Sequence, residues 1–208
     1  MKVLIADDHA IVRKGLKQII HEEYPQALIE EASNAEELIH KTMLDTWDVI
    51  ITDLSMPGRS GLDALRQIRE SFPKLPVLVL SMHPEDQYAI RVLNAGASGY
   101  INKDSAQEEL IVAMNKVLNG KKYISSRVAE QMAEAIDDNS NKAPHETLSD
   151  REFDVLKMLA SGKAVSEIAD MLSLSSTTIS TYRARILEKM KMKSNADITR
   201  YALENQLI

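Results

Sequence analysis

Five side chains in the first half of the chain carry groups that could handle a phosphoryl group. They are three carboxylates, a hydroxyl and an ammonium, at Asp7, Asp8, Asp53, Ser81 and Lys103. Three carboxylates that lie close together cannot all ionise cheaply without a cation, and oxygen ligands with room for water suit Mg²⁺. A metal ion and a lysine that neutralise the transferred oxygens would fit phosphoryl transfer onto a carboxylate nucleophile.

These groups can act together only if short strands bring them to one edge of a sheet. Apolar runs typical of buried strands cover 3–6, 49–52 and 77–80, with weaker candidates at 27–31 and 99–102. Amphipathic stretches alternate with the runs, so we expect an α/β fold with a doubly wound, five-stranded parallel sheet. The five groups follow the carboxyl ends of four strands, where such sheets bind ligands.

Capping signals predict where two helices begin. Helix capping is also an alternative, purely structural role for the aspartates at the strand ends. Ser33 with Glu36, and Ser105 with Glu108, have the spacing of capping boxes that start helices one residue later. An aspartate at a strand end is itself commonly the N-cap of the next helix. For a single aspartate this structural role stays open, but the combination at four successive strand ends favours a site.

The first half of the chain resembles the receiver domain of bacterial two-component response regulators. The resemblance covers roughly residues 1–118 and rests on Asp7-Asp8, the run 51–58, Ser81, Tyr100 and Lys103. It implies a flavodoxin-like fold and phosphorylation of Asp53 by a sensor histidine kinase. It also implies a phosphoacceptor rather than an enzyme, with Mg²⁺-dependent self-phosphorylation and self-dephosphorylation as its only chemistry.

The same resemblance assigns the metal ligands. Mg²⁺ would bind the carboxylates of Asp8 and Asp53 and the main-chain carbonyl of Ser55, and Asp7 would act mainly through water.

The resemblance also assigns a switch. Lys103 and the Ser81 hydroxyl would hold the phosphoryl oxygens. The hydroxyl would move toward the phosphate, and the ring of Tyr100 would turn inward behind it.

The second half of the chain predicts a separate small helical domain. Residues 119–148 read as a linker with a helix at 125–136, and a capping box of Ser149 and Glu152 starts a domain over 149–208. Four short helices are expected, at 150–160, 166–172, 176–191 and 195–205. The second and third of these have the form of a helix-turn-helix over 166–190.

The third predicted helix carries a face suited to DNA. Small polar side chains lie near its beginning and basic ones follow, which suits a helix docked in the major groove. The candidate DNA contacts are Thr177, Ser180, Thr181, Arg183, Ala184, Arg185 and Lys189.

A second resemblance supports this interpretation. The segments Leu148-Ser149-x-Arg151-Glu152-x-x-Val155-Leu156, Gly162, Glu167-Ile168-Ala169 and 178–182 resemble the LuxR-type DNA-binding domain, and the whole chain resembles a NarL/FixJ-class response regulator. The family usually carries Lys-x-His where this chain has Ser180-Thr181-Tyr182, so base preference does not carry over. The resemblance implies double-stranded DNA and a homodimer on activation, with RNA polymerase as a further candidate partner.

Composition agrees with two domains that have different partners. The net charge is −6 over 208 residues, but 1–148 carry 16 basic against 23 acidic residues and 149–208 carry 9 against 8. The absence of Cys excludes disulfides and thiolate metal sites. No apolar run approaches the ~20 residues of a membrane span, and the N-terminus turns acidic too early for a signal peptide, so we expect a cytoplasmic protein without membrane contact.

Two other classes of function remain open at this point. A phosphatase or phosphotransferase could turn over through an aspartyl phosphate, although such enzymes usually carry a general acid two positions after the nucleophile, where this chain has Ser55. A DNA-binding protein controlled by a protein partner, and never phosphorylated, is the other alternative.

Overall fold

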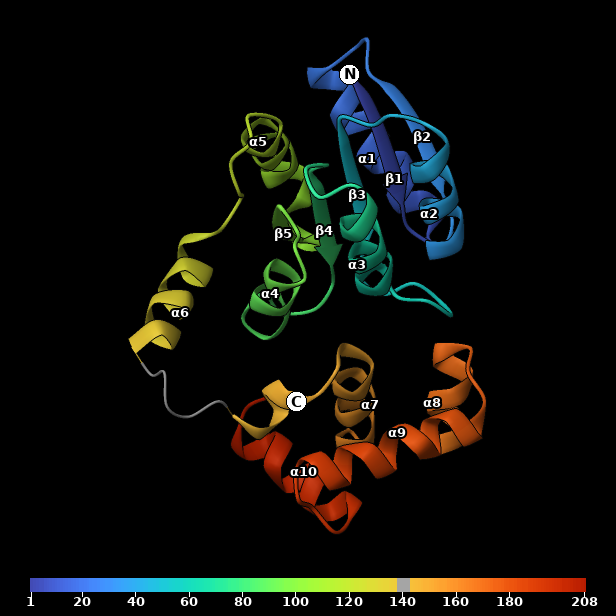
Figure 1. The fold of residues 1–208 in the computed structure, drawn as a ribbon, viewed down its shortest axis with the longest axis vertical. Helices are drawn as coiled ribbons and strands as arrows, with labels where there is room; N and C mark the ends of the chain where they lie inside the picture. The colour runs from blue at the N-terminus through green and yellow to red at the C-terminus, as the bar shows by residue number, and fades with distance from the viewer. Residues whose placement is uncertain (138–142) are drawn as a thin grey trace. The chain divides into compact units, whose positions relative to one another are not determined.

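The computed structural model describes residues 1–137 and 143–208 (Figure 1). They form two compact units, Met1–Glu134 and Ala135–Ile208. Residues 138–142 of the predicted linker lie outside the described residues. No helix among the described residues is long and apolar enough to cross a membrane.

The first unit is built on a parallel sheet with the strand order β2-β1-β3-β4-β5. Its strands are β1 (Lys2–Ala6), β2 (Leu28–Ala32), β3 (Val49–Asp53), β4 (Val77–Ser81) and β5 (Gly99–Asn102). The two central strands β3 and β4 are buried along their whole length, which is why they read as continuous apolar runs. The predicted five-stranded α/β fold is confirmed.

Five helices cover the two faces of this sheet. They are α1 (Ala10–Glu23), α2 (Ala35–Leu44), α3 (Gly61–Ser71), α4 (Glu85–Asn94) and α5 (Ala106–Leu118). Helices α1 and α5 pack together on one face, and α2 and α3 pack together on the other, as right-handed crossovers require (Figure 1).

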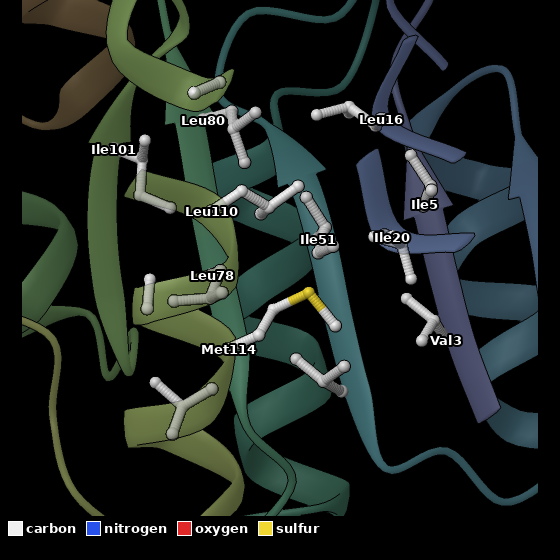
Figure 2. Close-up of a cluster of buried hydrophobic side chains, with 14 of the residues drawn as sticks. Val3, Ile5, Leu16, Ile20, Ile51, Leu78, Leu80, Ile101, Leu110 and Met114 are labelled. Carbon is white, nitrogen blue, oxygen red and sulfur yellow. The ribbon is translucent and has the colours of Figure 1, made fainter. Parts of the chain in front are cut away.

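The core between the sheet and the α1–α5 layer is aliphatic. Leu16 and Ile20 reach it from α1, and Leu110 and Met114 from α5, to pack against Ile51 and its neighbours on the strands (Figure 2). All are nearly inaccessible to solvent. Burial of each such side chain stabilises the fold by about 1.5–3 kcal/mol, so this layer holds the carboxyl ends of the strands in register.

Both predicted capping boxes differ from the structure, although α5 begins at Ala106 as predicted. Helix α2 is capped by Asn34, whose side chain accepts from the amide of Glu37, while the Glu37 carboxylate accepts from the amide and hydroxyl of Ser33. The capping pattern is therefore displaced by one residue. Ser105 precedes α5 without a capping hydrogen bond, because its hydroxyl donates to the carbonyl of Asn102 instead.

The chain beyond α5 stays attached to the sheet edge. Tyr123 forms an isolated parallel bridge with Gly99, and its hydroxyl donates to Glu109 at 2.7 Å. Helix α6 (Ser126–Asp137) follows, and Arg127 on it lies 2.7 Å from Asp86 on α4.

The second unit is helical, as predicted. A short 3-10 turn, η2 (Pro144–Thr147), precedes α7 (Asp150–Ala160), α8 (Val165–Leu172), α9 (Ser176–Lys189) and α10 (Asn195–Glu204). The capping box of Ser149 and Glu152 is present at the start of α7.

The third helix of the second unit ends two residues earlier than the prediction. Met190 closes α9, and the next residue, Lys191, takes a left-handed φ of 55°, which a continuing right-handed helix does not allow.

Candidate phosphoacceptor site and DNA-facing helix

Neighbouring strands bring the predicted acidic residues together at the carboxyl end of the sheet. The β1–β3 register pairs Ala6 with Thr52, so Asp7, just beyond β1, and Asp53, the last residue of β3, stand at the same edge of the sheet. Lys103, directly after β5, lies with its Nζ atom 2.7 Å from Asp7 and 3.0 Å from Asp53. One ammonium therefore bridges two of the three carboxylates.

Burial controls the charge of this cluster. Asp53 is only 4% exposed, and the loss of hydration raises the pKa of its carboxyl group despite the neighbouring ammonium. Burial alone would lower the pKa of Lys103, but hydrogen bonds and charge from Asp7 and Asp53 outweigh it, so the pKa of Lys103 is raised. Asp53 is thus a buried carboxylate beside a cation.

The cluster has the donor set of a divalent metal site. Asp7, Asp8, His9 and Asp53 each offer one ligand atom, and these atoms lie within 4.8 Å of one another. The Oδ1 atom of Asp8 is buried and accepts no well-aligned hydrogen bond, and its ion-pair contact is with His9 Nδ1 at 2.9 Å. A buried carboxylate oxygen without a hydrogen bond favours a cation beside it, and oxygen ligands suit Mg²⁺.

Ser55 lies close enough to take part, since its main-chain amide donates a hydrogen bond to Asp53.

Ser81 and Tyr100 meet at the main chain of His83. The hydroxyl oxygen of Ser81 accepts from the His83 amide at 3.0 Å, and the Tyr100 hydroxyl donates to the His83 carbonyl at 2.7 Å. The Tyr100 ring is buried, and burial raises the pKa of its hydroxyl to about 12. The predicted switch pair is thus joined by a hydrogen bond between its two side chains and also through His83, which the sequence did not single out for this role.

Gly61 is a second residue that the sequence analysis missed. A Cβ atom at this position would lie 1.8 Å from the main-chain carbonyl oxygen of Asp53. Helix α3 begins at Gly61, after the Ser60 cap, so only a residue without a side chain lets it start against the candidate phosphoacceptor. A glycine directly after a serine cap was the available signal.

In the second unit, α9 presents most of its predicted contacts to solvent. Thr177, Ser180, Thr181, Ala184 and Arg185 are all exposed, while Ile179 and Ile186 on the opposite side are buried. The exposed face is therefore free of any packing role within the described part of this unit.

Two of the predicted basic contacts are engaged within the protein. The Nε atom of Arg183 donates to Asn195 at 2.6 Å. The ammonium of Lys189 lies 2.6 Å from Glu152. In the described part of the chain, no hydrogen bond or ion pair holds the Arg185 side chain, so of the three predicted cationic contacts it is the best placed to reach a phosphate.

Family comparisons agree with both units. Residues 3–115 match the family described as "Response regulator receiver domain", and residues 146–202 match "Bacterial regulatory proteins, luxR family". A receiver fold with an acidic pocket, joined to a helix-turn-helix domain, defines a signal-responsive DNA-binding regulator.

Relatives are similar over their whole lengths. Response regulator UvrY of Escherichia coli K12 is 34% identical over 208 residues, with 100% of this chain and 95% of UvrY covered. Oxygen regulatory protein NreC of Staphylococcus carnosus is 37% identical over 215 residues, with 100% and 99% covered. The chain belongs to the NarL/FixJ-class response regulators of two-component systems.

Solved structures of this class are similar as well. RcsB from Salmonella enterica serovar Typhimurium, bound to promoter rprA in the presence of the phosphomimetic BeF3-, has a TM-score of 0.63 at 29% identity, covering 97% of this chain and 98% of that one. An RcsB–DNA complex has a TM-score of 0.57 at 31% identity, covering 97% and 96%. Members of this class are transcription factors rather than classical enzymes.

Proposed function

We propose that Asp53 accepts a phosphoryl group from a sensor histidine kinase and that this event controls DNA binding by α9. The observation that carries the proposal is the position of Lys103, whose ammonium contacts both Asp7 and Asp53 at the buried end of β3. A carboxylate nucleophile needs a fixed positive charge where the transferred oxygens arrive, and Lys103 provides it.

The transfer balances with the groups present. A carboxylate oxygen of Asp53 forms a bond to phosphorus while the phosphorus–nitrogen bond of the kinase's phosphohistidine breaks, and the electron pair stays on the imidazole nitrogen. Lys103 then exchanges its contact with the Asp53 carboxylate for contacts with the phosphoryl oxygens, and the hydroxyl of Ser81 donates to another of them. Self-phosphorylation from small acyl phosphates, whose carboxylate leaves as the Asp53–phosphorus bond forms, and self-dephosphorylation by water are the only further chemistry we assign.

We propose Mg²⁺ as the cofactor. Asp8, Asp53 and the main-chain carbonyl of Ser55 would hold it, with Asp7 acting mainly through water. When bound, the ion supplies positive charge that offsets the charge of the transferred oxygens. The buried Asp8 oxygen, which accepts no well-aligned hydrogen bond, supports this assignment.

The switch would run through His83. When the Ser81 hydroxyl turns toward a phosphoryl oxygen, it gives up its bond with the His83 amide, while the Tyr100 hydroxyl still donates to the His83 carbonyl. A dianion at Asp53 would thereby bias the loop before α4 between two arrangements.

The second unit would bind double-stranded DNA through the exposed face of α9. Short side chains at Thr177, Ser180, Thr181 and Ala184 allow close approach to base edges, and Arg185 would neutralise phosphate. The relative RcsB, solved with DNA, supports this proposal.

Activation would favour a homodimer that spans two half-sites about one DNA turn apart. RNA polymerase is a further candidate partner, and a DNA target places the action in the cytoplasm.

The domain limits also remain a proposal. A receiver over 1–118, a linker over 119–148 and a DNA-binding domain over 149–208 are supported by the two family matches at 3–115 and 146–202.

The test is the intact mass after incubation with acetyl phosphate and Mg²⁺, for the wild type and for Asp53→Asn, which keeps the shape of the side chain. A single phosphoryl adduct in the wild type alone supports the acceptor assignment. An unmodified wild type, or an adduct that persists in Asp53→Asn, would overturn it. Gel-shift titrations with a selected operator, with and without phosphorylation, then test the control of DNA binding.

A further inference from the structure

The main-chain carbonyl of Asp7 lies just beyond the sheet and is bound by a side chain. The last β1–β3 pair joins Ala6 to Thr52, and the Asp7 amide still donates to Ala32 on β2 at 3.2 Å. Among the described residues no main-chain amide outside the strands donates to the Asp7 carbonyl, and Arg13 of α1 donates to it through an Nη atom at 2.7 Å. A residue of α1 thus binds the first main-chain carbonyl beyond the paired part of β1.

The guanidinium of Arg13 is held in place from its other edge. Its Nε atom donates to Glu31 on β2 at 2.8 Å, and Lys17, one helical turn along α1, binds the second oxygen of the same carboxylate. The hydrogen bonds from Lys17 and Arg13 lower the pKa of Glu31, so the carboxylate stays charged. The planar, forked guanidinium of Arg13 presents separate N–H groups to these two acceptors in a fixed geometry.

We propose that Arg13 is a positioning residue for the metal-dependent phosphorylation of Asp53. The inference rests on the proposed function, because it concerns how the acidic cluster receives Mg²⁺. The Asp7 carbonyl and the Asp8 amide belong to one rigid peptide plane. By fixing the carbonyl, Arg13 fixes the orientation of this peptide plane. The plane in turn orients the Asp7 and Asp8 carboxylates relative to Asp53.

Position and charge predict opposite effects when Arg13 is removed. Loss of a positive charge near three carboxylates would by itself strengthen cation binding. Loss of the hydrogen bond to Asp7 would weaken it, because the carboxylates would no longer be held at the spacing that the ion requires. Weaker Mg²⁺ binding in an Arg13 variant would therefore show that Arg13 positions the carboxylates.

Lys17 supplies the matched control. It carries the same charge on the same helix and contacts the same Glu31, but in the described structure no hydrogen bond or ion pair joins it to Asp7. Lys17→Gln thus changes charge as Arg13→Gln does and leaves the Asp7 carbonyl bound.

The experiment is a titration of the full-length protein with MgCl₂, followed by the amide NMR signals of residues around Asp53. We expect the dissociation constant for Mg²⁺ to rise about tenfold in Arg13→Gln, the lower end of what lost outer contacts cause at metal sites. Lys17→Gln should bind at least as tightly as the wild type. The thermal midpoint of each variant separates this effect from unfolding.

Each outcome of the titration either supports or overturns the positioning role of Arg13. Unchanged Mg²⁺ affinity in a folded Arg13→Gln, or equal weakening in Lys17→Gln, would overturn the positioning role and leave the proposed function intact. A wild type that does not bind Mg²⁺ would overturn both. If Arg13→Gln does not fold, Arg13→Lys replaces it. We then expect roughly threefold weaker Mg²⁺ binding, because one of the two hydrogen bonds of Arg13 remains. Unchanged Mg²⁺ binding in Arg13→Lys would overturn the inference.

Discussion

The ammonium of Lys189, at the end of α9, lies 2.6 Å from a carboxylate oxygen of Glu152, in the first turn of α7. Glu152 is 2% exposed and also accepts from the main-chain amide of Ser149 at 2.8 Å. A single buried carboxylate therefore closes the cap of α7 and anchors the end of α9, the helix proposed to bind DNA.

Removal of this carboxylate should destabilise the DNA-binding unit. Glu152→Ala loses half of the capping box and the partner of Lys189, so we expect the free energy of unfolding to fall by about 1–3 kcal/mol. Far-UV circular dichroism during urea denaturation of the full chain measures the change. Glu188→Ala, an exposed position on α9, is the control and should change little. Equal stability of Glu152→Ala and the control would contradict the anchoring role.

The same pair predicts unequal roles for two basic residues of α9 in DNA binding. Arg185→Ala should weaken operator binding and reduce the slope of log K against log salt by about one unit, because one phosphate contact is lost. Lys189→Ala should change the slope less, since its ammonium is already paired with Glu152. Fluorescence anisotropy with a labelled operator at several salt concentrations measures both slopes. A larger loss in Lys189→Ala would show that the ion pair opens on DNA.

The cap of α2 should make stability depend on pH. Hydrogen bonds from the Ser33 amide, together with Lys41 and the Ser33 hydroxyl, outweigh burial and lower the pKa of Glu37 from 4.5 to about 2. The unfolded chain takes up this proton at higher pH than the folded protein, so the stabilisation is complete above pH 4.5 and is lost as the pH falls toward 2. The stability difference between wild type and Glu37→Gln should be constant near neutrality and shrink over that window. A difference that does not change with pH would contradict the shift.

Gly61→Ala should impair the phosphoacceptor site. The new Cβ atom would overlap the Asp53 carbonyl oxygen at 1.8 Å, so the backbone must move, at about 1–3 kcal/mol of stability. We expect slower labelling of Asp53 by acetyl phosphate, measured by intact mass.

Gly15→Ala is the matched control, because nothing lies within 4 Å of a Cβ atom there and the position is inside α1. Alanine should stabilise that helix by about 0.5–1 kcal/mol and leave labelling unchanged. Normal labelling of Gly61→Ala would show that the site tolerates the displacement.

Tyr100→Phe should separate phosphorylation from its consequence. The variant keeps the buried ring but loses the hydrogen bond to the His83 carbonyl, a change of about 0.5–1.5 kcal/mol. Asp53 should still be labelled, while the gain in DNA affinity on phosphorylation should shrink. Tyr123→Phe removes an equivalent hydroxyl, bonded to Glu109, and is the control for a non-specific loss. An undiminished gain in Tyr100→Phe would exclude the hydroxyl from the switch.

Much of the fold followed from local patterns in the sequence. Runs such as 49–52 and 77–80 predicted the central strands because both faces of these strands are buried, and the Ser149–Glu152 box marked the start of α7 correctly. The order of acids, hydroxyl and lysine along the chain also predicted the candidate site, since parallel strands bring their carboxyl ends to one edge.

Details at helix boundaries were harder to predict. Ser33 and Asn34 are both good caps, and the choice between them depends on where Glu37 and Lys41 come to lie. The sequence offers both alternatives, and only the folded geometry selects one.

Contacts between distant residues were decided by the tertiary structure alone. Arg13 on the Asp7 carbonyl, Gly61 against the Asp53 carbonyl and Lys189 on Glu152 each depend on strand register or on how two helices pack. Periodicity and capping signals act over a few residues, whereas these contacts form only after the sheet and the helices have assembled. The sequence by itself thus determined the helices and strands and the chemical groups at their ends. Tertiary packing determined which residues contact and orient those groups.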